Sequence, residues 1–219
     1  MNGSDTSGGQ RGGLRFFGRM TANLSHEFNN IITIIGEVAG LLDDLLLLAE
    51  KGRPLNTEKL KSLSDNVKRQ VERGKAVVKH MNFLGHSIDD RSREVDLGVL
   101  VENVTNLSKR IAERKGVALA AEPAVEPVVV NCDPFGVMQA VFLCVDAALG
   151  AGAVGVPIKI GVRRVEAGAE IAVESAAFEP FGSAEAKLED AGHLAAQMRA
   201  EFASQNEGEK RVAKITFQA

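Results

Sequence analysis

Residues 17–48 read FGRMTANLSHEFNNIITIIGEVAGLLDDLLLL, and the spacing of their apolar side chains decides the fold of the N-terminal part. The apolar positions alternate in steps of four and three, which is the heptad repeat of a helix that packs along one seam. This repeat predicts a helix from about residue 14 to about residue 50, on the order of 55 Å long. With one polar exception at Thr21, the seam consists of Phe17, Leu24, Phe28, Ile31, Ile35, Val38, Leu42 and Leu45.

A second heptad segment follows a break at Gly52, Pro54 and Asn56. Apolar residues from Leu60 to Leu84 recur close to every 3.5 residues, so we expect residues 14–88 to form an antiparallel helical hairpin. The leucines between residues 41 and 48 cover more of the first helix than one partner helix can bury. We therefore expect a homodimer, in which two hairpins form a four-helix bundle.

The rest of the chain predicts an α+β fold with a short linker before a second domain. Residues 1–13 have almost nothing apolar to bury, which predicts a disordered tail, and the polar residues 89–96 predict the linker. The second domain then spans residues 97–219. Its expected elements are helices at 97–113, 134–149 and 184–204, strands at 117–121, 128–131 and 212–217, and a β-hairpin at 158–173 that turns at residues 166–168.

Composition excludes several classes of function. A net charge of −3, with no Trp and no Tyr, argues against a nucleic-acid surface, which combines basic and aromatic side chains. Cys132 and Cys144 lack the spacing of a zinc site, so we expect no metal and two reduced core cysteines. No apolar run is long enough to cross a membrane, and the first residues do not resemble a signal peptide. These observations predict a cytoplasmic protein without a membrane partner.

Residues 24–30, LSHEFNN, carry the chemistry of the hairpin and resemble the H-box of sensor histidine kinases. The heptad places His26 at position f, facing away from the seam, with Asn30 one turn further along the same exposed face. The resemblance implies that His26 is phosphorylated, that Glu27 acts as its base and that Asn30 assists dephosphorylation. An imidazole nitrogen accepts a phosphoryl group only when unprotonated, and a neighbouring carboxylate can hold the other N–H.

The C-terminal half resembles the ATPase domain of the same family, beginning with CDPFGVMQAVFLCVDAAL at residues 132–149. That family carries two asparagines on this helix, and the aligned positions here are Leu143 and Ala147, which cannot ligate Mg²⁺. Ser175 lies near the position of the carboxylate that reads adenine, and the glycine-rich lid is absent. We therefore expect a degenerate ATPase-like domain with no cofactor and no metal.

Taken together, the resemblance implies a histidine phosphotransfer protein that relays phosphate between receiver-domain aspartates of response regulators through His26. The sequence favours a phosphohistidine carrier over an ATP-dependent histidine kinase. Two alternatives stay open. One is a divergent histidine kinase that retains weak ATP-dependent autophosphorylation. The other is a non-catalytic dimeric regulator or phosphatase of a response regulator, in which Asn30 matters more than His26.

Overall fold

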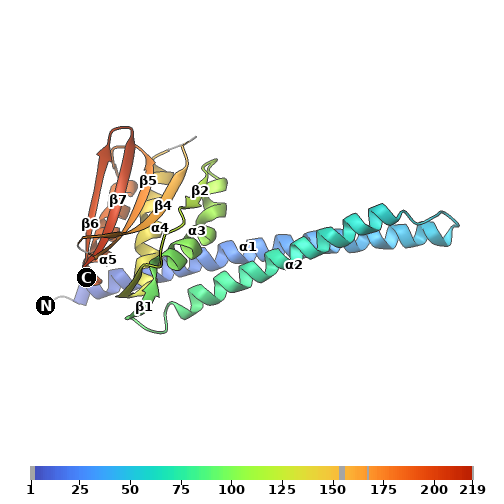
Figure 1. Cartoon of the computed structure of the whole chain (residues 1–219), viewed down its shortest axis with the longest axis horizontal. Helices are drawn as coiled ribbons and strands as arrows, with labels where there is room; N and C mark the ends of the chain where they lie inside the picture. Colours follow the sequence, from blue (N-terminus) through green and yellow to red (C-terminus); the bar gives the residue numbers. More distant parts are fainter. Residues whose placement is uncertain (1–2, 153–155, 167, 219) are drawn as a thin grey trace. The chain divides into compact units, whose positions relative to one another are not determined.

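The computed structural model describes residues 3–152, 156–166 and 168–218 of the chain. The chain divides into two compact units: Thr21–Asn82 forms one, and Met1–Met20 together with Phe83–Ala219 forms the other. The first is a helical hairpin, and the second combines helices with sheets (Figure 1). The predicted α+β class is therefore confirmed.

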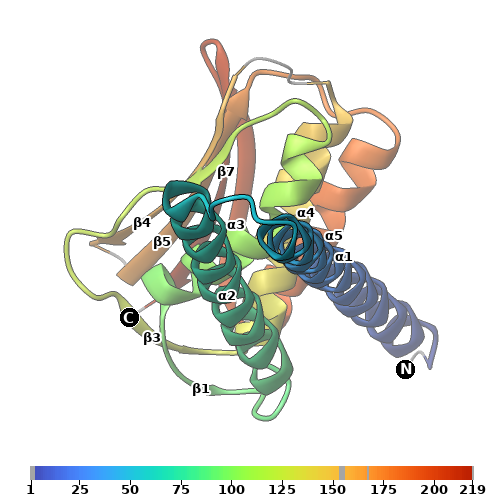
Figure 2. The ribbon, with the colours of Figure 1, turned by 90° about the vertical axis from the view of Figure 1, so that its right-hand side faces the viewer.

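The hairpin unit consists of parts of α1 (Gly3–Glu50) and α2 (Thr57–His86), which run side by side (Figure 2). Asn56 caps the N-terminus of α2, because its Oδ1 accepts a hydrogen bond of 2.9 Å from the backbone N–H of Lys59. Gly52 adopts a φ of 78° in the connecting loop, a left-handed conformation that favours glycine. These two residues end one helix and begin the next.

The heptad seam of α1 is only partly covered by α2. One half of the seam, Leu24, Ile31, Val38 and Leu45, is at most 9% exposed. Phe28, in the other half, is 41% exposed. A single partner helix thus leaves a broad apolar surface on the hairpin uncovered. The exposed large apolar side chains on it are Phe28, Ile32, Leu41, Leu46, Leu47, Leu48, Val71, Val78 and Met81.

Helix α1 begins earlier than the sequence predicted. The expected start was near residue 14, after a disordered tail, whereas the structure extends the helix to Gly3. Nucleation is the costly step of helix formation, and adding residues to an existing helix is cheap. The strongly periodic segment therefore propagates into a glycine-rich stretch that would not form a helix by itself.

The second unit contains a five-stranded mixed sheet in the order β2-β4-β5-β7-β6. Strands β2 and β4 are parallel, and the other neighbouring pairs are antiparallel. Three helices cover one face of this sheet (Figure 2). The strands are β2 (Leu119–Ala121), β4 (Ile158–Val165), β5 (Gly168–Ala176), β6 (Ala200–Glu207) and β7 (Lys210–Gln218), and the helices are α3 (Leu97–Glu113), α4 (Pro134–Gly150) and α5 (Ser183–Gln197).

Alternation along the strands separates the two faces of the sheet. Ile158 and Ile160 on β4 are fully buried on the helix side, whereas Lys159 and Arg163 lie on the opposite, polar face. The antiparallel pairing of β4 with β5 confirms the predicted β-hairpin. Its predicted turn includes Ala167, which lies outside the described residues.

Two segments differ from the sequence prediction. Residues 93–96, assigned to the linker, form β1 (Arg93–Asp96), which pairs with β3 (Val129–Cys132). The helix predicted to reach residue 204 ends at Gln197, so its last seven residues were assigned wrongly. Arg199 adopts a left-handed φ of 57° there, and the chain then pairs with β7 as β6. β1 pairs with the distant β3, whereas β6 forms a hairpin with β7, the next strand along the chain.

Both cysteines lie in the interior of this unit. Cys132 and Cys144 are free and buried. Burial raises the pKa of each thiol to about 12, and the nearby Asp133 carboxylate adds to the effect at Cys132. Such thiols remain protonated near neutral pH, so they behave as small apolar core groups.

Candidate functional site

The H-box residues lie on α1 within the hairpin unit. His26 is exposed, as its heptad position predicted, and Asn30 is also exposed one helical turn further along. Glu27, next to His26, is only partly exposed because its side chain is directed toward the other helix of the hairpin. The phosphoacceptor candidate therefore faces solvent, and its carboxylate neighbour is held against the protein.

Arg73 of α2 holds Glu27. Its Nη2 donates to Glu27 Oε1, which forms an ion pair between the two helices of the hairpin. The Glu27 side chain is 26% exposed and that of Arg73 is 47% exposed. Guanidinium groups orient carboxylates well because their donors are held in a rigid plane. The ion pair thus limits the orientations that the carboxylate beside His26 can adopt.

Two further polar residues of α2 support Arg73. Arg73 Nη1 donates to Gln70 Oε1 at 3.1 Å, and Gln70 Nε2 donates to Asn66 Oδ1 at 3.3 Å. Gln70 is only 6% exposed, so its amide needs these partners. The sequence analysis missed this network. The available signal was a glutamine interrupting an apolar seam, with Asn66 and Arg73 at helical spacing on the same face.

The ATPase-like helix α4 lacks ligands for magnesium. Leu143 and Ala147 occupy the positions where the resemblance implies asparagines, and Ala147 is fully buried. The nearby carboxylate, Asp146, pairs with Lys187 at 2.9 Å and with Arg19 at 2.8 Å. Two cations already neutralise that carboxylate, and a hard cation requires several oxygen donors. The residues of this helix therefore do not fit a magnesium–nucleotide complex.

The ion pairs determine the ionisation of Asp146. Burial alone would raise the pKa of its carboxyl group, but hydrogen bonds and charges from Arg19 and Lys187 outweigh burial, so the pKa is lowered. Asp146 is therefore a carboxylate across the physiological range. It acts as a structural anion with two fixed partners.

The end of β5 does not form an adenine site either. Ser175 is buried, and its hydroxyl donates to the backbone carbonyl of Ala176 at 3.1 Å. The next segment is also held in place, because Arg211 donates to the Phe178 carbonyl at 3.1 Å and stacks 5.0 Å from the centre of its ring. A nucleotide lid must move to admit its ligand. Here a buried arginine holds Phe178, just after β5, in place.

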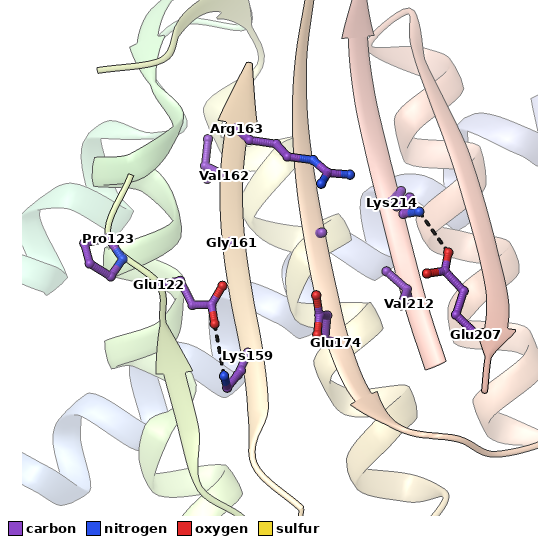
Figure 3. A pocket seen from close by; sticks show the side chains of 11 residues that line it. Glu122, Pro123, Lys159, Gly161, Val162, Arg163, Glu174, Glu207, Val212 and Lys214 are labelled. Carbon is purple, nitrogen blue, oxygen red and sulfur yellow. Dashed lines mark hydrogen bonds and ion pairs between the residues drawn. The ribbon is translucent and has the colours of Figure 1, made fainter. Parts of the chain in front are cut away.

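A shallow cavity of about 250 Å³ lies on the polar face of the sheet, away from the helices (Figure 3). Its walls contain charges of both signs. Lys159 pairs with Glu122 at 3.2 Å, and Lys214 pairs with Glu207 at 2.9 Å. These pairs largely neutralise one another, so the cavity offers no excess of positive or negative charge to a ligand.

The part of the chain that the structure describes contains neither a metal-binding cluster nor a membrane-spanning helix. No cluster of three or more His, Cys, Asp or Glu side chains there could hold a metal ion. No helix there is sufficiently long and apolar to span a lipid bilayer.

No protein-family model matches the chain, and no curated protein matches it. Among solved structures, the catalytic domain of histidine kinase ThkA is similar, with a TM-score of 0.51 at 14% identity, covering 59% of this chain and 96% of that one. At this identity the likeness establishes the fold alone. The C-terminal unit therefore has the fold of a histidine kinase catalytic domain.

Two structures match over most of the chain. Histidine kinase AdeS of Acinetobacter baumannii has a TM-score of 0.49 at 17% identity, covering 88% of this chain and 97% of its own. A bacterial phosphotransferase has a TM-score of 0.48 at 10% identity, covering 92% of this chain and 96% of its own.

The lowered pKa of Asp146 predicts a pH-dependent contribution to stability. Because the folded-state pKa lies below the unfolded value of about 3.9, the contribution is present above that pH and is lost as pH falls through the folded-state pKa. Asp146→Asn should reduce the free energy of unfolding by about 1–2 kcal/mol at pH 7, and the difference from the wild type should shrink below about pH 4. Urea unfolding between pH 2.5 and pH 7 measures both. Parallel pH profiles for the two proteins would contradict this assignment.

Proposed function

We propose that this chain is a histidine phosphotransfer protein, a dimeric cytoplasmic carrier that takes a phosphoryl group from a receiver domain onto His26 and passes it to another receiver. The observation that carries the proposal is the arrangement on the hairpin. An exposed histidine stands beside a carboxylate that an arginine of the other helix holds in place. The ATPase-like unit supports it, because α4 of that unit carries Leu143 and Ala147 where the resemblance implies metal ligands.

The proposed transfer is a displacement at phosphorus. The unprotonated ring nitrogen of His26 attacks the phosphoryl group of an aspartyl phosphate, so that an N–P bond forms and the P–O bond to the aspartate breaks. The aspartate leaves as a carboxylate. Glu27 accepts a hydrogen bond from the other ring N–H, which maintains the reactive tautomer and stabilises positive charge on the ring.

Arg73 has a positioning role in this scheme. By holding Glu27 Oε1, it restricts the rotamers that the carboxylate beside His26 can adopt. Asn30 lies one turn along from His26, where it can position a water molecule for dephosphorylation. The receiver brings its own acidic pocket and Mg²⁺, so the chain needs no metal site.

Replacing His26 should abolish labelling. We expect phosphorylated receiver domains to transfer ³²P to the wild type and not to His26→Ala or His26→Gln, since no other residue is proposed to accept the group. His26 faces away from the seam, so circular dichroism and light scattering should show an unchanged fold. Equal labelling of wild type and His26→Ala by a panel of receivers would exclude the phosphocarrier function. Labelling that persists unchanged in Asn30→Ala would separate transfer from dephosphorylation.

Loss of Arg73 should slow transfer without removing it. Glu27→Ala removes the carboxylate and should lower the rate by about 10²-fold or more, the usual size of a general-base or orienting effect. Arg73→Ala leaves the carboxylate but releases it, so its effect should be smaller, and Arg73→Lys should restore part of the rate. Arg69→Ala is the matched control, because Arg69 is an exposed arginine one turn away on α2. Quench-flow labelling measures the rates; identical rates for Arg73→Ala and Arg69→Ala would remove Arg73 from the site.

The uncovered apolar surface of the hairpin supports a homodimer. It includes Phe28 and Leu41 on α1 and Val71 and Val78 on α2, each of which is at least 40% exposed. Large exposed apolar patches are rare on monomers and usually mark an interface. A second hairpin covering it would produce a four-helix bundle.

Charge at this surface should dissociate the dimer. We expect the wild type to be a dimer at micromolar concentration and Leu41→Glu to shift it to monomer, since an unpaired buried charge is costly. Leu55→Glu is the control, because Leu55 is similarly exposed, at 46%, but lies in the loop between the helices. Multi-angle light scattering distinguishes the species. A monomeric wild type would exclude the bundle.

The chain should bind no Mg-ATP with micromolar affinity. A ligand present at a hundredfold its dissociation constant stabilises a fold by about 2.7 kcal/mol, which a thermal shift detects easily. We expect no shift with Mg-ATP beyond that produced by MgCl₂ alone, and no heat of binding in calorimetry. Saturable binding, especially with incorporation of the γ-phosphate into His26, would support a divergent histidine kinase in place of the phosphotransfer protein.

A further inference from the structure

The first part of α1 belongs to the ATPase-like unit and not to the hairpin. Met1–Met20 is grouped with Phe83–Ala219, and two of its apolar side chains, Phe16 and Met20, are deeply buried. Phe16 is 4% exposed and Met20 is fully buried. The ring centre of Phe16 lies 5.4 Å from those of both Phe135 and Phe142 on α4, and the contact with Phe135 is edge-to-face. Aromatic pairs at this separation are attractive beyond their buried area.

A bidentate ion pair lies beside these rings. Arg19 Nη1 lies 2.8 Å from Asp146 Oδ2, and Arg19 Nη2 donates to Asp146 Oδ1 at 2.9 Å. The same guanidinium lies 4.9 Å from the centre of the Phe142 ring. Two parallel N–H···O bonds specify direction as well as adding energy. The Asp146 side chain is only 11% exposed, so this contact is partly shielded from solvent.

Two glycines allow α1 to approach α4 closely. A Cβ atom at Gly13 would lie 3.2 Å from a ring carbon of Phe135, and one at Gly12 would lie 3.1 Å from Gln139 Nε2. Any other residue at these positions would push the helices apart or displace the α4 side chains. Gly12, Gly13, Phe16 and Arg19 thus present one continuous face of α1.

The α4 residues in these contacts also share one face. Phe135, Gln139, Phe142 and Asp146 follow helical spacing. The two faces match in shape, through the glycines and aromatic rings, and in charge, through Arg19 and Asp146. This is more than incidental packing of a chain end, because an aromatic cluster and a fixed ion pair coincide.

We propose that this face of α4 is a helix-binding site and that its ligand is the first part of α1, anchored by Phe16 and Arg19. Asp146, the carboxylate beside the positions where the resemblance implies metal ligands, binds a guanidinium in place of a metal. The ATPase-like fold then holds the N-terminal part of the helix that carries His26. His26 lies seven residues beyond Arg19 on that helix. The proposal stands whether or not His26 carries phosphate.

Hydrogen exchange on the whole 219-residue chain tests whether α4 binds the first part of α1. Amides of residues 11–20 should be protected in the wild type, and Arg19→Ala should speed their exchange about tenfold or more, as expected for loss of a charge-assisted hydrogen bond. Asp146→Asn should accelerate the same amides, although Asp146 is 127 residues away in sequence. Arg15→Ala is the matched control, because Arg15 is exposed on the same helix four residues earlier and the substitution changes helix propensity equally.

A conservative substitution at Arg19 provides an intermediate case. Arg19→Lys retains the charge but not the bidentate geometry, so the amides of residues 11–20 should exchange at a rate between those of the wild type and Arg19→Ala. Phosphotransfer to His26 is measured separately and has no bearing on the result. Fast exchange of residues 11–20 in the wild type, or equal exchange in the Arg19→Ala and Arg15→Ala proteins, would overturn the proposal.

Discussion

Burial of the apolar stripe of α1 is the constraint on which both units depend. A 48-residue helix gains most of its stability in water from packing its apolar face against other elements. Two different surfaces provide that packing. Phe16 and Met20 are buried in the ATPase-like unit, whereas Ile31 and Val38 are buried in the hairpin. Phe16 and Met20 therefore lie on the same helix as Ile31 and Val38 but have different structural partners.

Residues 24–30 of this helix, which resemble an H-box, must meet two different requirements. His26 must face solvent if a partner protein is to reach it, while its neighbouring carboxylate must be oriented. Adjacent helical positions differ by about 100° in direction, which places His26 outward and Glu27 toward α2. The polar residues Gln70 and Arg73 interrupt the apolar seam of α2 for this reason. Their hydrogen bonds compensate for the polar groups that the seam buries.

The C-terminal unit illustrates how a fold can persist when its site changes. Its sheet order, caps and buried strands require apolar alternation and a few turn residues, and none of these requirements involves the positions that would contact a nucleotide. Leu143 and Ala147, at the positions where the resemblance implies metal ligands, are therefore compatible with the core. In the same unit Asp146 pairs with Arg19 and Lys187, and Arg211 holds the Phe178 segment, so these groups make structural contacts.

The sequence by itself determined the features that arise from local periodicity: the two heptad helices, the break between them, the alternation of apolar and polar residues in β4 and β5, and the outward direction of His26. Each is encoded within a window of a few turns, so no distant partner is needed to infer it. Only the tertiary structure decided the extension of α1 to Gly3, the strands β1 and β6, the contact of Arg73 with Glu27, and the ion pair of Arg19 with Asp146. These features depend on strand partners, on the register of two helices and on residues far apart in the chain. Local patterns do not specify which distant groups will satisfy a buried charge or an unpaired strand edge.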